Sequence, residues 1–274
     1  MGSSIDSLGI IAGSHSLPLE IARRARADGV GRLVGIGFEG ETSAEMGDLV
    51  DAMGWVKVGQ LSKLIRFFKK EGVTRCVMGG QIAPKNLFKI RPDLRASALL
   101  LRLKERNAHT IFGGIADELE KDGIELMEAT PWLRSLMPGP GFQIGSRLKP
   151  DQQNDLAFGA RIAKEVSRLE IGQSVVVKEG TVLAVEGFEG TDRCLRRGGE
   201  LAGKKGGAIA VKVAKLDHDM RFDIPCVGEA TIRTCVESGI TVLGIEASRV
   251  IVLERAKIEA LLAKHRMTLI AVSV

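Results

Sequence analysis

The chain has 274 residues and a formal net charge of +5, with 39 lysines and arginines against 34 acids. It holds no tyrosine and only 4% aromatic residues, so it is poorly supplied with base-stacking platforms for single-stranded nucleic acid. The modest basic excess favours an anionic ligand or an anionic membrane surface over a dedicated nucleic-acid site. A solvated basic surface without any partner is equally compatible with it.

No stretch approaches the roughly 18 apolar residues of a spanning helix, and the N-terminus lacks a basic region followed by an apolar one. Asp6 stands where an N-myristoylation signal has Ser or Thr. The four cysteines form no C-x-x-C pair and three lie in apolar runs, as buried free thiols in a reducing compartment do. These features predict a cytoplasmic protein that is at most peripheral to a membrane.

The first half alternates short apolar runs with amphipathic segments. Strands are predicted at 8–12, 33–37, 56–58 and 75–78, with helices ending near 27 and spanning 61–70. This βα rhythm predicts a parallel, Rossmann-like sheet, which binds its ligands at the carboxyl ends of the strands.

Small and polar residues follow two of these strands: Gly13 and Ser14 after the first, and Gly80 and Gln81 after the fourth. A strand, a Gly/Ser loop and a helix start present backbone N–H groups to phosphate. The full G-x-G-x-x-G pattern of dinucleotide-binding domains is absent, so a dinucleotide site is not supported.

From residue 84 to 122 the pattern becomes helical, with helices expected at 96–105 and 110–121. The apolar and basic stretch 88–103 is typical of an apolar chamber, a membrane-facing surface, or a packed helix with a basic solvent face. The Pro-Gly-Pro-Gly cluster at 138–141 is the strongest structure-breaking signal. We therefore predict an N-terminal Rossmann-like α/β domain at 1–137, a linker at 138–150 and a C-terminal α/β domain with a mixed sheet at 151–274.

The second half contains a hairpin at 175–185 that leads into a helix carrying several arginines. Three carboxylates lie at this junction, Glu186, Glu189 and Asp192, with glycines between them. Carboxylates are hard oxygen ligands and glycines let backbone approach a ligand, so the junction suits Mg²⁺ or phosphate. Alternatively, Thr191 or Asp192 only caps the following helix.

A second polar cluster, 217–223, holds Asp217, Asp219, Arg221 and Asp223, after a strand that ends near Lys212 and Lys215. Opposed acids and cations are what metal-assisted attack on a phosphate ester needs, because the cations neutralise the charge that develops on oxygen. An ordinary polar loop gives the same spacing.

Four blocks of the sequence resemble the LpxI family, whose members are UDP-2,3-diacylglucosamine pyrophosphatases of lipid A biosynthesis. These blocks are GIIAGSHSLP (9–18), IGQSVVVKEGTVLAVEGFEGTDRCLRRGGEL (171–201), VKVAK (211–215) and MRFDIPCVGEATI (220–232). The resemblance spans nearly the whole chain and implies a two-domain cytoplasmic enzyme that forms homodimers. It also implies hydrolysis that depends on Mg²⁺, or on Mn²⁺, with water attacking the α-phosphate to give lipid X and UMP.

The family's essential aspartate falls on Asp223. We predict Asp192, Asp223 and Glu189 as metal ligands. The predicted substrate contacts are Gly13, Ser14, Gly80, Gln81, Thr191, Lys212, Lys215 and Arg221. The chain departs from the family where Ser14 and His15 follow Gly13 and where the segment 79–88 reads GGQIAPKNLF.

The expected partner is therefore a lipid-linked UDP-sugar, with peripheral contact to the inner membrane and no nucleic acid. Two other functions stay open at this point. A non-catalytic nucleotide-sugar binding or regulatory protein would keep the early Gly/Ser loop without needing Asp223. A Rossmann-type oxidoreductase lacks its glycine fingerprint here, although Glu39 lies near the position of a ribose-binding acid.

Overall fold

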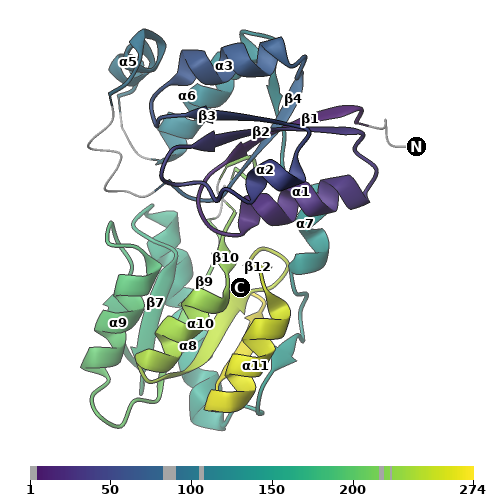
Figure 1. The fold of residues 1–274 in the computed structure, drawn as a ribbon. Helices are drawn as coiled ribbons and strands as arrows, with labels where there is room; N and C mark the ends of the chain where they lie inside the picture. The colour runs from purple at the N-terminus through teal and green to yellow at the C-terminus, as the bar shows by residue number, and fades with distance from the viewer. Residues whose placement is uncertain (1–4, 83–90, 105–107, 216–218, 223) are drawn as a thin grey trace. The chain divides into compact units, whose positions relative to one another are not determined.

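The computed structural model describes residues 5–82, 91–104, 108–215, 219–222 and 224–274. The chain forms two compact units (Figure 1). The N-terminal unit comprises Met1–Leu133 with Asp219–Asp223, and the C-terminal unit comprises Arg134–His218 with Ile224–Val274. A short segment of the second half of the sequence thus belongs to the N-terminal unit.

The N-terminal unit is built on a five-stranded parallel sheet in the order β3-β2-β1-β4-β5. Its strands are β1 (Ser7–Ala12), β2 (Arg32–Phe38), β3 (Ala52–Val56), β4 (Arg75–Gly79) and β5 (Glu125–Leu126). Its helices are α1 (Leu17–Ala27), α2 (Met46–Leu49), α3 (Leu61–Lys70), α5 (Leu94–Arg102), α6 (Ala108–Glu120) and α7 (Thr130–Leu133). Figure 1 shows α3 and α1 on opposite faces of this sheet, as a Rossmann-like layer order requires.

Helix α3 shows why the predicted amphipathic segment folds where it does. Its buried side chains, Leu61, Leu64, Ile65 and Phe68, recur every three or four residues and so share one face. Lys69 and Lys70 lie in its last turn, where cations are stabilised by the helix dipole.

The strand predicted at 56–58 is misplaced: the structure has β3 at Ala52–Val56, so the two overlap only at Val56. This segment, AMGWV, has one β-branched residue and a central glycine, so its own sequence favours a strand weakly. Its strand conformation comes from parallel pairing with β2, in which Val34 lies opposite Ala52 and Phe38 opposite Val56.

The C-terminal unit has a mixed six-stranded sheet in the order β6-β13-β11-β9-β7-β8 and a parallel pair formed by β10 and β12. Its strands are β6 (Gln143–Ile144), β7 (Ser174–Lys178), β8 (Thr181–Val185), β9 (Ala208–Lys212), β10 (Cys226–Val227), β11 (Ile240–Glu246), β12 (Ile251–Val252) and β13 (Thr268–Val272). Its helices are α8 (Pro150–Arg168), α9 (Thr191–Leu201), α10 (Glu229–Glu237) and α11 (Arg255–His265), with a 3₁₀ turn at Arg134–Leu136.

Strand β7 divides the core of this unit into two layers. Val175 and Val177 pack with α8 residues, whereas Val176 packs with residues of α9, α10 and α11. Successive strand residues point to opposite faces, so the valine run predicted as a buried strand serves both layers.

The hairpin between β7 and β8 turns at Glu179 and Gly180, both of which have positive φ. Two consecutive positive φ values match the twist of a tight hairpin. The Asp155 carboxylate accepts hydrogen bonds from the N–H groups of Glu179 and Gly180, each at 2.7 Å. The hairpin predicted from the sequence is thereby confirmed.

The stretch predicted as a linker, 138–150, contains β6 and the first residue of α8. Strand β6 pairs antiparallel with β13 at the edge of the C-terminal sheet. None of the helices in the described ranges is both long and apolar enough to cross a bilayer. The thiols of Cys76, Cys194 and Cys235 are free and buried, as predicted, while Cys226 is half-buried.

Candidate functional site

The first predicted site lies where β1 and β4 end, at the centre of the N-terminal sheet. From β1 the chain continues outward to β2 and β3 on one side, whereas β4 and β5 lie on the other. The order reverses between β1 and β4, and such switch points are where open α/β sheets bind ligands. Gly13 and Ser14 follow β1 directly, and Gly80 and Gln81 follow β4, so the sheet brings these four predicted residues together.

Hydrogen bonds join the two loops directly. The Gly13 N–H donates to the Gly79 carbonyl at 2.8 Å, and the Ser14 N–H donates to the Gln81 carbonyl at 2.8 Å. The Ser14 hydroxyl also donates to the Gln81 carbonyl, at 2.8 Å. The N–H groups predicted to face a phosphate are therefore already used to hold the loops together.

Close packing explains the glycines here. A Cβ on Gly13 would lie 2.7 Å from the Gln81 carbonyl oxygen, and one on Gly80 would lie 2.5 Å from the Ser14 oxygen. Gly80 also has a φ of +86°, which disfavours other residues. The two glycines thus let the loops meet, and ligand contacts by these four residues stay a prediction.

Arg221 is paired with a neighbouring carboxylate. Its guanidinium donates to both oxygens of Asp219, at 2.6–3.1 Å, and this hydrogen bonding raises the pKa of Arg221. The adjacent Phe222 ring lies 5.7 Å from the Phe112 ring, both within the N-terminal unit. Asp217 and Asp223, the other acids predicted around it, lie outside the described residues.

The second predicted site lies at one edge of the C-terminal sheet. Strand β8 runs antiparallel to β7, which runs antiparallel to β9, so β8 and β9 end at the same edge. Glu186 follows β8, Lys212 closes β9, and helix α9 begins at Thr191 between them in the sequence. The N-cap of α9 is Gly190, with a φ of +84°, so the alternative that Thr191 or Asp192 caps this helix is wrong.

The Thr191 hydroxyl links an acid to a base across this edge. It donates to Glu186 Oε1 at 3.0 Å and accepts from Lys212 Nζ at 3.0 Å. The other Glu186 oxygen, Oε2, is buried without a hydrogen-bond partner among the described residues. We call Glu186, Thr191 and Lys212 the edge triad; it joins a cation and a carboxylate through one hydroxyl group.

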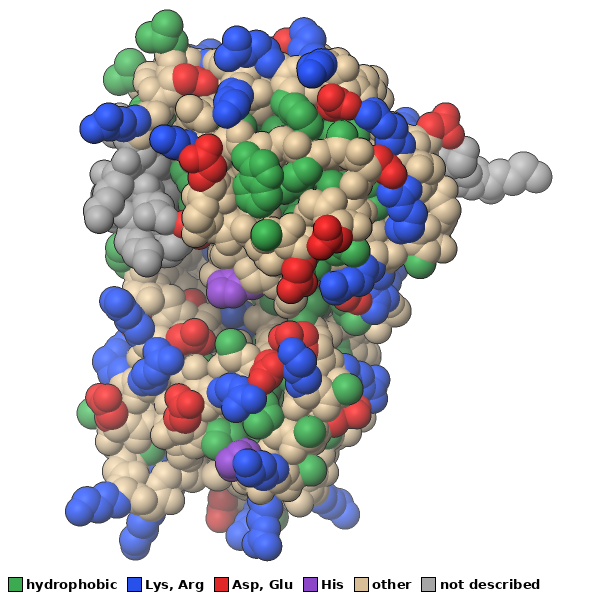
Figure 2. Space-filling view, viewed as in Figure 1, with side chains coloured by type: hydrophobic (Ala, Val, Ile, Leu, Met, Phe, Trp, Pro, Cys, Tyr) green, Lys and Arg blue, Asp and Glu red, His purple; other side chains and the backbone are tan. Residues whose placement is uncertain are grey.

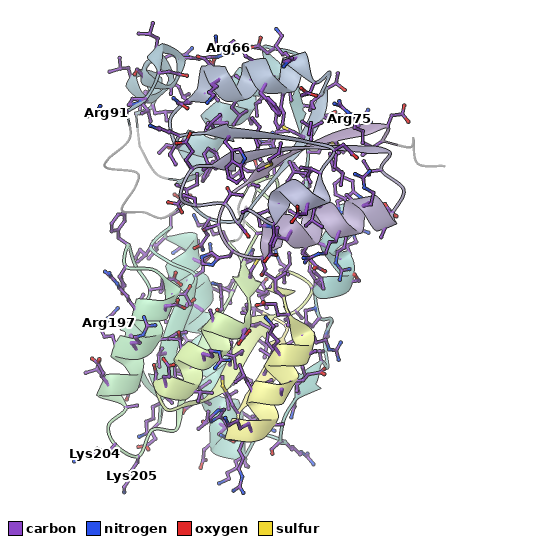
Figure 3. All side chains as sticks on the ribbon, viewed as in Figure 1. Arg66, Arg75, Arg91, Arg197, Lys204 and Lys205 are labelled. Carbon is purple, nitrogen blue, oxygen red and sulfur yellow. The ribbon has the colours of Figure 1, made fainter. Side chains whose placement is uncertain are left out.

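Glu189 has other partners. Its carboxylate accepts from Arg197 of α9, at 2.5 Å, and from the Gly187 N–H, at 3.1 Å. The Arg197 hydrogen bond holds the pKa of Glu189 below its usual range. Figure 3 labels Arg197 on α9. Both oxygens of this predicted metal ligand are thus engaged.

The described residues do not by themselves form a metal centre. Asp192 is exposed in the first turn of α9. No group of three or more His, Cys, Asp or Glu residues suited to a metal ion occurs within the described part of the chain. Since Glu189 is paired to Arg197 and Asp223 lies outside the described residues, metal ligation by Asp192, Asp223 and Glu189 stays a prediction.

Sequence reasoning missed a buried ion pair at the end of β9. Lys164 of α8 contacts both oxygens of Glu246, at 2.7 and 2.8 Å, and donates to the Ala214 carbonyl at 3.0 Å. Glu246 also accepts from the Ala214 N–H at 2.8 Å. Arg249 donates at 3.3 Å to the carbonyl of Lys215, the residue that follows Ala214. The available signal was a glutamate, Glu246, inside the otherwise apolar run 243–247.

These contacts fix the N–H and the carbonyl of Ala214. Ala214 lies at the start of the segment that leads to Asp223. Lys215, predicted to contact phosphate, lies at this fixed start and is half-buried. The predicted residues thus fall into separate groups: the β1/β4 loops, the edge triad with its acidic neighbours, and Arg221 with Asp219.

Solved structures resemble the chain only weakly. The biotin carboxylase domain of 2-oxoglutarate carboxylase from Hydrogenobacter thermophilus is 14% identical with a TM-score of 0.30, covering 74% of this chain and 42% of that one. The biotin carboxylase subunit of a pyruvate carboxylase is 13% identical with a TM-score of 0.28, covering 68% and 38%. The chain spans less than half of either structure, and similarity at this level carries no functional argument.

Sequence comparison is more specific. The LpxI N-terminal domain profile matches residues 7–136, and the LpxI C-terminal domain profile matches residues 139–270. A protein of Caulobacter vibrioides named UDP-2,3-diacylglucosamine pyrophosphatase LpxI is 30% identical over 265 residues, covering 92% of each chain. Because both domain profiles match in order and together span nearly all of the sequence, the chain belongs to the LpxI family.

Proposed function

We propose that this protein hydrolyses the pyrophosphate bond of UDP-2,3-diacylglucosamine, giving 2,3-diacylglucosamine 1-phosphate (lipid X) and UMP. The observation that carries the proposal is similarity along the whole chain, through both domain profiles, to a relative named for this substrate. The match covers 92% of the relative's own length.

The chemistry of the edge triad is compatible with such a substrate. A pyrophosphate gathers negative charge on its oxygens as it is cleaved, and a fixed cation stabilises that charge. The Lys212 ammonium is held at 3.0 Å by the Thr191 hydroxyl. In this proposal Lys212 and Thr191 contact the phosphates, with Lys215 as a further cation.

In the proposed reaction, the oxygen of water forms a bond to the α-phosphorus of the uridylyl group. The bond between that phosphorus and the bridging oxygen breaks, and lipid X leaves with the bridging oxygen. One proton of the water is released as the oxygen attacks. We assign Asp223 to orient the water and accept that proton, on its match to the essential aspartate of the family.

Dependence on Mg²⁺, with Mn²⁺ as a substitute, is part of the proposal. Mg²⁺ would supply neutralising charge to the phosphates, and oxygen ligands are those it prefers. Glu186, with its buried and unpartnered Oε2, is the described carboxylate best able to accept a cation. On the same resemblance we propose a cytoplasmic homodimer that takes its lipid from the inner membrane.

The direct test incubates the purified protein with UDP-2,3-diacylglucosamine in detergent micelles and separates the products by chromatography. The proposal predicts equal amounts of UMP and lipid X with Mg²⁺, and neither product in excess EDTA. Full activity in EDTA would exclude the metal requirement alone. Intact substrate under every metal condition would instead favour the non-catalytic binding protein.

A further inference from the structure

Helix α5 carries two leucines that are almost fully exposed. Leu94 is 91% exposed and Leu101 is 79% exposed, the two highest values among the exposed large hydrophobic residues described. Ala98 lies between them and is also exposed. Positions i, i+4 and i+7 share one helix face, so these residues form a single apolar line, here called the α5 stripe.

The opposite face of α5 is firmly packed. Ala96 and Leu99 are buried in the core of the N-terminal unit, and Leu99 fills the space beside Gly114 of α6. Asp93 caps the helix by accepting the Ala96 N–H at 2.9 Å, and it also accepts the Ser62 N–H at the start of α3 at 2.7 Å. The stripe is therefore held outward by a fixed helix.

Cations exceed acids in an ion-pair network that includes two arginines of α5. Glu118 and Asp122 are shared among four cationic side chains: Lys69, Arg95, Arg102 and Lys121. Hydrogen bonds from Lys121, Arg95 and Arg102 lower the pKa of Glu118 to about 2, so the network stays ionised and has a net positive charge.

Much of this positive charge faces solvent. The side chains of Lys69, Arg102 and Lys121 stay more than half exposed despite their ion pairs. Arg91 and Lys104, on either side of α5, are also exposed. Figure 2 shows hydrophobic side chains standing out at the position of α5 among Lys and Arg side chains, and Figure 3 labels Arg66 and Arg91 nearby.

We infer that the α5 stripe docks this protein onto an anionic lipid bilayer. Leucines on a fixed helix enter the acyl boundary while the surrounding cations meet lipid phosphates, the arrangement of interfacial amphipathic helices. The inference rests on the proposed function in one respect, because a diacylated substrate resides in such a bilayer.

The charge distribution favours a bilayer over a second copy of the chain. A two-fold contact through the stripe would place the same cationic rims against each other, and like charges across an interface repel. An anionic bilayer instead supplies charge opposite to these cations.

The test measures cosedimentation of the full-length protein with vesicles of phosphatidylcholine containing phosphatidylglycerol, and with pure phosphatidylcholine vesicles. The variant Leu94→Gln/Leu101→Gln removes the apolar stripe. The matched control, Leu169→Gln/Ile171→Gln, removes two exposed apolar side chains of the C-terminal unit, which are 57% and 52% exposed. All four side chains are largely solvated, so melting temperatures should stay close to that of the wild type.

We expect the wild type to bind the anionic vesicles, and the α5 variant to bind at least about tenfold more weakly. The control variant should bind as the wild type does. Arg91→Gln and Lys104→Gln should each weaken binding to anionic vesicles about fivefold, and added salt should weaken it further.

Equal binding by the wild type and the α5 variant would overturn the inference. So would a change from dimer to monomer in the α5 variant without loss of vesicle binding, which would identify the stripe as a contact between copies. Hydrolysis in detergent micelles separates this inference from the proposed function. The docking inference predicts unchanged micellar hydrolysis in the α5 variant and slower hydrolysis on vesicles. Vesicle binding without hydrolysis by the wild type would refute the proposed function alone.

Discussion

Thr191 is the residue through which the edge of the C-terminal sheet is organised. Its hydroxyl contacts Glu186 and Lys212, and both of these contacts are 3.0 Å long. If this geometry holds Lys212 against a phosphate, Thr191→Val should lower kcat by roughly tenfold or more, since a misplaced cation stabilises developing charge poorly. Thr191→Ser keeps the hydroxyl and should retain most activity.

Comparison of these two variants tests whether the Thr191 hydroxyl contributes to turnover. Steady-state kinetics on both, with melting temperatures, separates a lost hydroxyl from a disturbed helix start. Similar kcat values in the Val and Ser variants would show that the hydroxyl has no part in turnover.

Asp223 carries the catalytic assignment. Helix α10 begins at Glu229 with Gly228 as its N-cap, so capping of that helix does not explain an aspartate at 223. Pro225 biases Ile224 towards an extended backbone, which limits how the aspartate is presented. Asp223→Ala should lower turnover about 100-fold or more, the scale of a lost general base, and still bind substrate. Near-normal turnover with a lowered melting temperature would contradict the assignment.

The lowered pKa of Glu118 predicts that the free energy of unfolding depends on pH. Its side chain is 6% exposed, and its ion pairs lower its pKa from 4.5 to about 2. A carboxylate whose pKa is lower in the folded state than in the unfolded state stabilises the fold at pH values above its unfolded-state pKa. This stabilisation is lost as the pH falls through the folded-state pKa. The contribution, on the order of 1–2 kcal/mol because its partners are solvated, should disappear between about pH 4.5 and 2.

Urea unfolding of the wild type and of Glu118→Gln at several pH values measures this contribution. The difference in unfolding free energy between the two proteins should be largest near neutral pH and should vanish in strong acid. A difference that does not change with pH would show that Glu118 acts through packing.

Among the larger elements, strand β9 is fixed at its carboxyl end by the buried Lys164–Glu246 pair. The side chains are 16% and 7% exposed, so removing one partner leaves a poorly solvated charge. Glu246→Ala should lower the unfolding free energy by about 3 kcal/mol or more. The control Glu165→Ala breaks an exposed pair with Arg168 and should cost less than about 1 kcal/mol. Equal losses in the two variants would refute a special role for the buried pair.

The elements predicted best from the sequence are those whose own pattern specifies them. Helix α3 was predicted with its observed bounds because its apolar residues repeat at helical spacing, and the β7–β8 hairpin because a valine run precedes Glu179-Gly180. Strand β3 was misplaced because its pairing with β2, and not its own residues, makes it a strand.

Contacts between residues far apart in the chain could not be predicted from the sequence. Thr191 and Lys212 are 21 positions apart, and Lys164 and Glu246 are 82 positions apart. Such pairs depend on the order and register of strands, which the residue pattern does not determine. The sequence did identify Gly13 and Gly80 as strand-end residues, but only the structure shows that they meet through their backbones.

At the scale of the whole molecule, the α/β prediction of a parallel N-terminal sheet and a mixed C-terminal sheet is confirmed. The two LpxI profiles cover the corresponding parts of the chain. The structural units do not follow the sequence strictly, because Asp219–Asp223 belongs to the N-terminal unit. This segment overlaps the block 220–232 that resembles the family.

The central claim is hydrolysis at the α-phosphate, and isotope labelling tests it most directly. The protein is incubated with UDP-2,3-diacylglucosamine and Mg²⁺ in ¹⁸O-water, and both products are weighed by mass spectrometry. Attack by water on the α-phosphorus predicts one ¹⁸O atom in UMP and none in the phosphate of lipid X. Label in lipid X with unlabelled UMP would move the attack to the other phosphorus and contradict the account.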